Sequence, residues 1–218
     1  MPDQTTAVAE WRQEDPGVIP AGDVYGGGSP TGIAFYENGI LEDRFGGYVI
    51  SCEPARNVLF GYHPQAKGAG WALPQRDTFL TSNPKKNFAG ADFASAGRIN
   101  GLINLFRPSD VCIGPDGAIY VADWFDARVG GHGTRDAGQT GAIYRIAPKD
   151  AKLSIPKFDL TTIKGQIEAL KSPSPNVREL GRACLVKAGN KSIPAVRKLL
   201  AHSNSFIQAR AIWVLGKL

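Results

Sequence analysis

Short apolar runs separated by turn residues dominate the chain up to about Pro148. The runs are rich in β-branched and aromatic residues, and glycine, proline or asparagine follows each of them. This pattern is typical of β-strands joined by tight turns. The runs are TGIAFYENG, GYVISC, NVLFGYHP, SDVCIGPDG, GAIYVADW and GAIYRIAP.

A helical pattern replaces the strand pattern after about Phe158. Apolar residues recur at spacings of three and four, which places them on one face of an amphipathic helix. The intervening stretch APKDAKLSIPKF, residues 147–158, is rich in proline and lysine and predicts a linker. We therefore expect two domains, residues 1–150 and residues 151–218. The helical segments are DLTTIKGQIEALKS, NVRELGRACLVKAG, SIPAVRKLLAHS and SFIQARAIWVLGKL.

The strand-rich part contains an internal repeat. The segment from Pro30 to Ile33 matches the segment from Pro108 to Val111, GGYVIS matches GAIYVA, and NVLFGYHP matches GAIYRIAP. Repeated strand units of this kind predict the blades of a β-propeller. Because a closed ring has about 4–8 blades, we expect a partial propeller formed by the last blades, and an internal fragment of a longer protein.

The helical part repeats as well, with a shift of about 30 residues. The repeat predicts paired helices stacked as a HEAT-like α-solenoid. The pattern ends inside a helix, so we expect truncated repeats. The matching positions are Val177, Gly181 and Leu185 in one unit and Ile207, Ala211 and Leu215 in the next.

The composition fits a folded protein rich in turns: 43% of residues are hydrophobic, 21% are charged, and 26 are glycine. The net charge is +5, but the basic residues are spread along the chain, which argues against nucleic acid as a partner. No apolar run approaches the ~20 residues of a membrane span. The first residues lack the pattern of a signal peptide.

The three cysteines, Cys52, Cys112 and Cys184, are widely separated and form no CxxC or CxxCH motif. Zinc and covalently bound haem within this chain are therefore not expected. Each cysteine lies in an apolar pattern, so we expect three buried thiols.

Charged residues cluster directly after the apolar run GAIYV. The stretch YVADWFDARVGGHGT contains Asp123, Asp126, Arg128 and His132, followed by a glycine. Strand alternation places Asp123 at the end of a strand, where loops of a propeller converge and form ligand sites. In a purely structural alternative, the aspartates cap turns, Arg128 pairs with one of them, and the glycines supply positive φ angles.

A family resemblance rests on these same residues. The run FRPSDVCIGPDGAIYVADWFDARVGGHGT, followed by GAIYRIAPK and helical repeats, resembles the membrane-bound dehydrogenase family, whose propeller is similar to that of soluble sugar and sorbosone dehydrogenases. GGGSPTGIAFYENG fits the preceding blade. In this family, HEAT repeats and a c-type cytochrome domain follow the propeller.

The resemblance implies pyrroloquinoline quinone (PQQ) and Ca²⁺ as cofactors, with haem c only in a region outside this chain. It also implies a periplasmic, secreted or cell-envelope location. Arg128 would bind an acidic group of the quinone or substrate, and His132 would accept a proton from a substrate hydroxyl. Asp123 and Asp126 would contact the cofactor or bind Ca²⁺.

We therefore expect part of a quinone-dependent sugar or alcohol dehydrogenase that passes electrons to a c-type cytochrome. The alternative is a non-catalytic scaffold, in which the propeller binds a glycan or protein and the helical repeats bind a protein partner.

Overall fold

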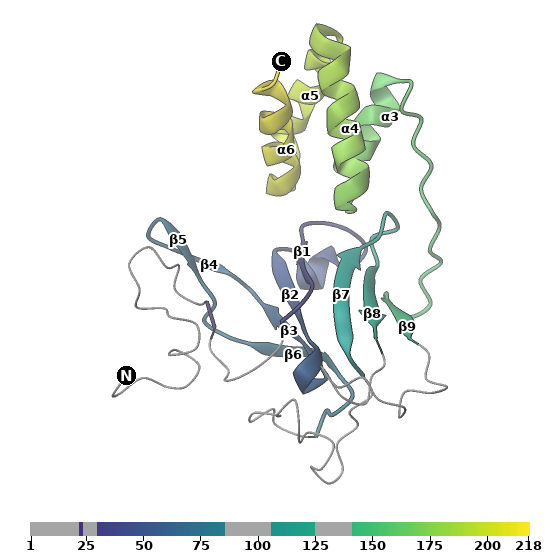
Figure 1. The fold of residues 1–218 in the computed structure, drawn as a ribbon. Helices are drawn as coiled ribbons and strands as arrows, with labels where there is room; N and C mark the ends of the chain where they lie inside the picture. Colours follow the sequence, from purple (N-terminus) through teal and green to yellow (C-terminus); the bar gives the residue numbers. More distant parts are fainter. Residues whose placement is uncertain (1–21, 24–29, 86–105, 125–140) are drawn as a thin grey trace. The chain divides into compact units, whose positions relative to one another are not determined.

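The computed structural model describes residues 22–23, 30–85, 106–124 and 141–218. Along the chain, small antiparallel sheets come first and helices follow (Figure 1). The chain divides into two compact units. The first consists of Met1–Phe35, Tyr48–Val111 and Val121–Tyr144, and the second of Tyr36–Gly47, Cys112–Tyr120 and Arg145–Leu218.

The largest sheet has four strands in the order β1-β2-β3-β6. In β2, Tyr48, Ile50 and Cys52 are buried, which is the alternation expected when one face of a strand covers a core. Every residue of β3 is buried, because this strand lies between two neighbours. The strands are β1 (Ile33–Tyr36), β2 (Tyr48–Glu53), β3 (Val58–Tyr62) and β6 (Asp77–Thr81).

A tight turn joins β2 to β3. It contains the 3₁₀ helix η1 (Pro54–Arg56), and Asn57 follows it with a left-handed φ of 57°. Asparagine tolerates this conformation better than most residues. The antiparallel register pairs Glu53 with Val58 on either side of the turn. The turn therefore places charged side chains at the end of a buried hairpin.

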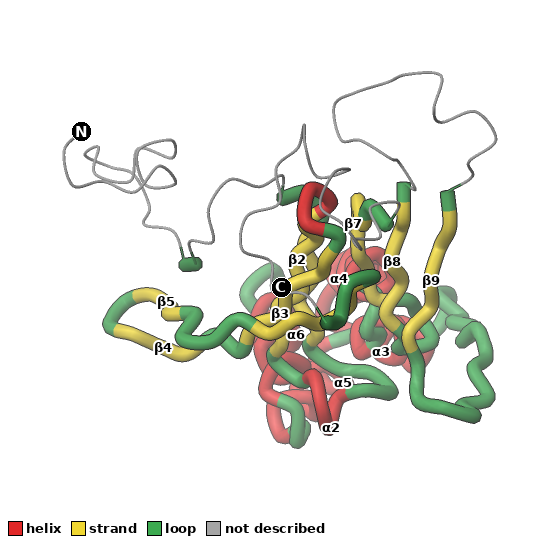
Figure 2. The backbone as a smooth tube through the Cα atoms, turned by 90° about the horizontal axis from the view of Figure 1, so that it is seen from below, coloured by secondary structure: helices red, strands yellow, loops and turns green. Residues whose placement is uncertain are grey.

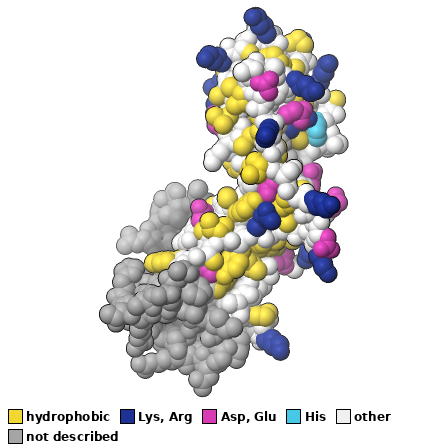
Figure 3. Space-filling view, turned by 90° about the vertical axis from the view of Figure 1, so that its right-hand side faces the viewer, with side chains coloured by type: hydrophobic (Ala, Val, Ile, Leu, Met, Phe, Trp, Pro, Cys, Tyr) yellow, Lys and Arg dark blue, Asp and Glu magenta, His cyan; other side chains and the backbone are white. Residues whose placement is uncertain are grey.

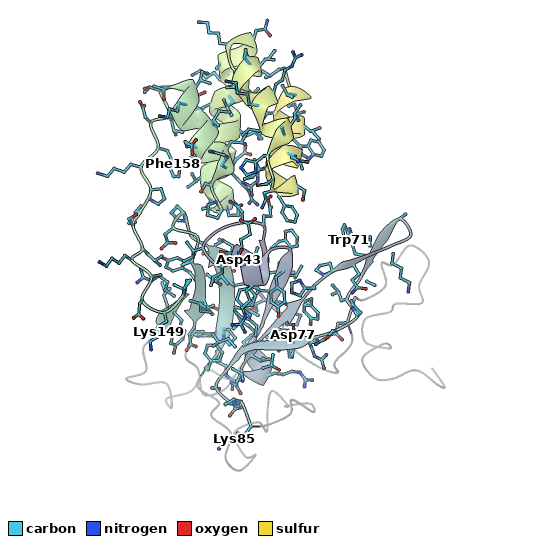
Figure 4. All side chains as sticks on the ribbon, turned by 180° about the vertical axis from the view of Figure 1, so that it is seen from behind. Asp43, Trp71, Asp77, Lys85, Lys149 and Phe158 are labelled. Atoms are coloured by element: carbon cyan, nitrogen blue, oxygen red, sulfur yellow. The ribbon has the colours of Figure 1, made fainter. Side chains whose placement is uncertain are left out.

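Two smaller sheets complete the strand-rich part. β4 (Gln65–Lys67) and β5 (Gly70–Ala72) form a hairpin that carries Trp71, which is 72% exposed (Figure 4). The other sheet has the order β7-β8-β9, and its strands lie side by side in Figure 2. These strands are β7 (Pro108–Ile113), β8 (Ile119–Asp123) and β9 (Ala142–Ile146).

The helices begin where the sequence provides caps. Thr162 and Asn204 precede α3 and α6, and each side chain accepts hydrogen bonds from backbone N–H groups of the first turn. Pro175 begins α4, where its missing N–H costs no hydrogen bond. The helices are α2 (Glu42–Phe45), α3 (Ile163–Lys171), α4 (Pro175–Ala188), η4 (Gly189–Lys191), α5 (Ile193–Lys198), η5 (Leu199–Ala201) and α6 (Ser205–Leu215).

One apolar core holds the C-terminal helices together. All four helices from α3 to α6 contribute to it, and Lys and Arg side chains surround it (Figure 3). Gly181 allows α4 to approach α3 closely, because a Cβ at this position would lie 2.8 Å from the carbonyl oxygen of Gln166. The buried residues are Leu170, Leu185, Val196, Leu199, Ile207, Ala211 and Val214.

The prediction of a partial β-propeller followed by HEAT-like repeats is wrong. A propeller repeats one blade, whereas the described strands form sheets of four, two and three strands. A solenoid stacks equivalent helix pairs, whereas these helices differ in length and share a single core. Local periodicity identified strands and helices correctly, but it does not determine how many elements close around one core. The boundary near residue 150 remains a prediction.

The cysteine prediction holds only in part. Cys52 is buried, Cys112 is exposed and Cys184 is intermediate. Trp213 is 72% exposed. Within the described ranges, the longest and most apolar helices fall short of what a membrane span requires.

Candidate functional site

Of the four predicted site residues, Asp123 lies among the described residues. Asp126, Arg128 and His132 lie in residues 125–140, outside them. Their predicted roles in binding a quinone, an acidic substrate group or Ca²⁺, and in accepting a proton, therefore stay predictions.

Asp123 ends strand β8 and is buried, with 4% of its surface exposed. Its Oδ1 accepts a hydrogen bond from the backbone N–H of Arg107 at 2.8 Å, and its Oδ2 accepts one from the Tyr144 hydroxyl at 3.2 Å. The N–H of Trp124 donates to the carbonyl oxygen of Arg107 at 2.9 Å. Asp123 therefore fixes the chain at the point where the predicted motif begins.

The contact with Asp123 changes the pKa of the Tyr144 phenol. Partial burial and the neighbouring carboxylate of Asp123 raise the pKa of the Tyr144 phenol. A raised pKa favours the protonated phenol, which is the form that donates to Asp123. Its ring also packs edge to face against Phe106, with the ring centroids 5.9 Å apart.

The Arg107 side chain is almost fully buried, with 1% exposure. Its Nη1 donates to the carbonyl oxygens of Pro54 at 2.7 Å and Ala55 at 3.3 Å. Both carbonyls belong to the turn η1. Arg107 therefore ties the beginning of β7 to the end of the β2–β3 hairpin.

Two further side chains complete the connection. Glu53 Oε1 accepts a hydrogen bond from the N–H of Ala55 at 3.2 Å and so caps η1. Asn57 Nδ2 donates to the carbonyl oxygen of Phe106 at 2.7 Å. Arg56 is 1% exposed beside them. We call Glu53, Arg56, Asn57, Arg107 and Asp123 the buried polar cluster.

The buried polar cluster combines two arginines with two carboxylates, so its formal charges balance. Charged groups are expensive to bury unless hydrogen bonds replace their lost hydration. Here several of those bonds go to backbone groups, and they join residues 53–57, 106–107 and 123–124. The cluster therefore fixes the backbone of these three segments relative to one another. The last of them ends immediately before residue 125.

Sequence reasoning identified only one member of this cluster, Asp123. The missed signal was the pair of charged segments CEPARN and FRP, each adjoining an apolar strand. Charged residues at such positions have to be solvated or mutually satisfied. Their mutual contact was not foreseeable, because Arg107 lies 53 residues from the carbonyl it binds.

Asp123 is the described candidate for a Ca²⁺ ligand. Both carboxylate oxygens of Asp123 already accept a hydrogen bond. Across residues 22–23, 30–85, 106–124 and 141–218, no three His, Cys, Asp or Glu side chains are grouped so that they could hold a metal ion. The described residues therefore do not by themselves form a Ca²⁺ site.

A second charged cluster lies in the second unit. Glu37 binds Arg178 at 2.8 Å and Arg210 at 2.6 Å, and the three side chains are between 10% and 21% exposed. Arg210 Nη1 also donates to the carbonyl oxygens of Leu170 and Ser172, each at 3.1 Å. Desolvation lowers the pKa of Arg178, although the Glu37 carboxylate opposes this shift. The three side chains join α4 and α6 to the segment after β1.

No family model matches the chain, and no curated protein matches it. Among solved structures, the chain is similar to an oxidoreductase from Thermus thermophilus that is named as a glucose dehydrogenase, with 17% sequence identity and a TM-score of 0.39. The match covers 60% of this chain and 29% of that protein. An oxidoreductase is thus a distant structural neighbour, and no family is assigned.

Proposed function

We propose that the chain is part of a dehydrogenase-like oxidoreductase that acts on a hydroxyl group of a sugar or alcohol. PQQ is its proposed electron acceptor, and a c-type cytochrome is the proposed next carrier. The sequence resemblance around residues 106–134 motivates this proposal. That resemblance carries it, and the structure adds a motif start that is held by hydrogen bonds of Asp123 and Trp124 with the backbone of Arg107.

A fixed starting point matters for catalysis, because a misplacement of about 1 Å can cost about 100-fold in rate. In the proposed site, Arg128 binds an acidic group through two parallel N–H donors. His132 accepts the proton of the substrate hydroxyl as the carbon is oxidised to a carbonyl. PQQ, when bound, supplies the two-electron acceptor that this oxidation requires. Asp123 acts as a positioning residue.

The first experiment adds PQQ and Ca²⁺ to the purified protein and measures reduction of an artificial dye across a panel of sugars and alcohols. We expect dye reduction that depends on both the quinone and one class of substrate. Quinone binding is measured separately by titration. A protein that neither binds the quinone nor reduces the dye would overturn the proposal.

The matched substitution is His132→Ala, with His63→Ala as its control. His63 is exposed and packs edge to face on Tyr48, with ring centroids 4.6 Å apart. We expect His132→Ala to lower kcat by about 100-fold or more with little change in KM, as for the loss of a general base. The control should retain its activity.

A non-catalytic scaffold that binds a glycan or protein is the second candidate. The observation that favours it is the structural role of Asp123, whose two carboxylate oxygens are both engaged by the protein. In a scaffold, His132→Ala would change affinity at most, and no substrate of the panel would be turned over. Glycan binding without dye reduction would therefore favour the scaffold.

A further inference from the structure

Positive charge is concentrated in the helical part of the chain, in contrast to the even spread inferred from the whole sequence. Residues 163–218 contain ten Lys and Arg but two Asp and Glu, a formal charge of +8. Residues 1–162 contain fifteen basic and eighteen acidic residues, a formal charge of −3. The helices therefore attract acidic partners far more strongly than the rest of the chain.

Four of the ten cations form ion pairs, and six do not form one with any described residue. Arg178 and Arg210 bind Glu37, Arg182 binds Glu179, and Lys171 binds Glu168. The remaining six are all exposed to solvent. They are Lys164, Lys187, Lys191, Arg197, Lys198 and Lys217.

Three of these six lie at the same end of the helices. Both helices begin near Glu37, because Arg178 in the first turn of α4 binds its carboxylate and Asn204, the N-cap of α6, donates to its carbonyl oxygen. Lys187 is nine residues beyond Arg178, or about 13 Å along the axis of α4 at a rise of about 1.5 Å per residue. Lys217 follows the end of α6 at Leu215. Lys191 follows in η4. Figure 3 shows Lys and Arg side chains around this end of the helices.

Large apolar side chains are exposed on α4 and α6, the helices that these cations follow or end. Trp213 is 72% and Ile212 is 61% exposed on α6, and Leu180 is 55% exposed on α4. Leu180 lies seven residues before Lys187 and so shares a face of α4 with it. Trp213 lies in the last turn of α6, and Lys217 follows just after the helix ends. A cation at a helix C-terminus is favoured by the helix dipole, but this does not explain an exposed indole.

The outward side of α6 is apolar in addition to its core side. Ile207, Ala211 and Val214 form the buried face, while Ile212 and Trp213 point away from it. A helix that is apolar on more than one side is normally covered on more than one side. Tryptophan is also among the residues that contribute most to protein interfaces.

We propose that Leu180, Lys187, Lys191, Trp213 and Lys217 form a docking surface for an acidic protein partner. Carboxylates of the partner pair with the three lysines, and its apolar side chains cover Trp213 and Leu180. Nucleic acid would use the lysines but leave the apolar side chains without a role. A membrane surface would engage the most apolar side of a helix, and in α6 that side is buried in the core.

The test uses the whole chain and a fluorescent 20-residue peptide made of glutamate and leucine in amphipathic order. Binding is measured by fluorescence anisotropy at low salt. We expect the peptide to bind, and Trp213→Ala and Lys217→Glu each to weaken binding at least tenfold. Lys149→Glu is the charge-matched control, because Lys149 is exposed after β9, outside the helices (Figure 4). It should change binding by less than about threefold.

Several results would overturn the proposal. They are the absence of peptide binding, equal losses in the Lys217→Glu and Lys149→Glu variants, or no effect of Trp213→Ala. Tighter binding of a 20-base-pair DNA duplex, or of phosphatidylserine vesicles, with the same dependence on Trp213 would replace the acidic protein by another class of partner. A concentration-dependent dimer in light scattering that Trp213→Ala abolishes would assign the surface to a second copy. Circular dichroism confirms that each variant is folded.

Discussion

Glu37 is the carboxylate on which two arginines of the helical part converge. Arg178 and Arg210 approach it at 2.8 and 2.6 Å, and the Nε of Arg210 donates a further hydrogen bond to it at 3.1 Å. The substitution Glu37→Gln keeps the shape of the side chain and removes its charge. Two arginines would then face each other, largely buried, without a counter-charge.

The magnitude follows from burial. Breaking a fully buried ion pair by removing one partner costs about 3–5 kcal/mol. Glu37 is 17% exposed, and Arg210 and Arg178 are 10% and 21% exposed, so water compensates a part of this cost. We expect Glu37→Gln to lower the free energy of unfolding by about 2–3 kcal/mol, or the melting temperature by about 5–10 °C for a chain of this size.

Thermal unfolding is followed by circular dichroism at 222 nm, because α3 to α6 dominate the helical signal. The matched control is Glu179→Gln, which removes the carboxylate of the pair between Glu179 and Arg182. That pair is exposed, with 59% and 37% of the side chains accessible, so its loss should not change the melting temperature measurably. Both variants remove one negative charge from an ion pair, but the control carboxylate faces one arginine instead of two and lies at the surface.

A melting temperature of Glu37→Gln within about 1 °C of the wild type would refute the reasoning. Equal shifts in the two variants would refute it as well, because burial would then have no effect. A further check combines Glu37→Met with Arg210→Met. Since a buried charge without a partner is the cause of the loss, this pair of substitutions should recover part of the stability.

Further predictions concern packing, ionisation and the buried polar cluster. Gly181→Ala should destabilise the helices by about 1–3 kcal/mol in thermal unfolding, because the new methyl group meets the backbone of α3; unchanged stability would contradict the close packing. Burial raises the pKa of Cys52 to about 12. A thiol reagent at pH 8 should therefore label Cys112 and spare Cys52 until unfolding. Between pH 9 and 12 the unfolded thiol ionises while the folded one keeps its proton, so this group makes stability fall as pH rises; Cys52→Ala should flatten that fall. Arg107→Met should cost about 2–4 kcal/mol by leaving buried carbonyls without a charged donor, detected as faster labelling of Cys52 in dilute urea.

Much of the local structure was readable from the sequence. The apolar runs became strands β1, β2, β3, β7, β8 and β9, and the amphipathic segments became α3 to α6. Pro175 and Asn204 mark helix beginnings through their own chemistry, since one lacks an N–H and the other caps the first turn. PDG forms the turn before β8, with Gly117 at a φ of 80°. These features depend on neighbouring residues, which the sequence displays directly.

The tertiary structure decided which surfaces meet. An apolar periodicity shows that a face is buried but not what covers it, so repeated strand patterns suggested propeller blades where sheets of unequal size formed. Arg107 contacts η1 across 53 residues, and Arg210 contacts Glu37 across 173. Such pairings depend on chain topology, because the energy of a buried charge is set by the partner that folding brings to it. For the same reason, only the folded chain shows that Trp213 and Cys112 are exposed and that Asp123 supports the backbone of Arg107.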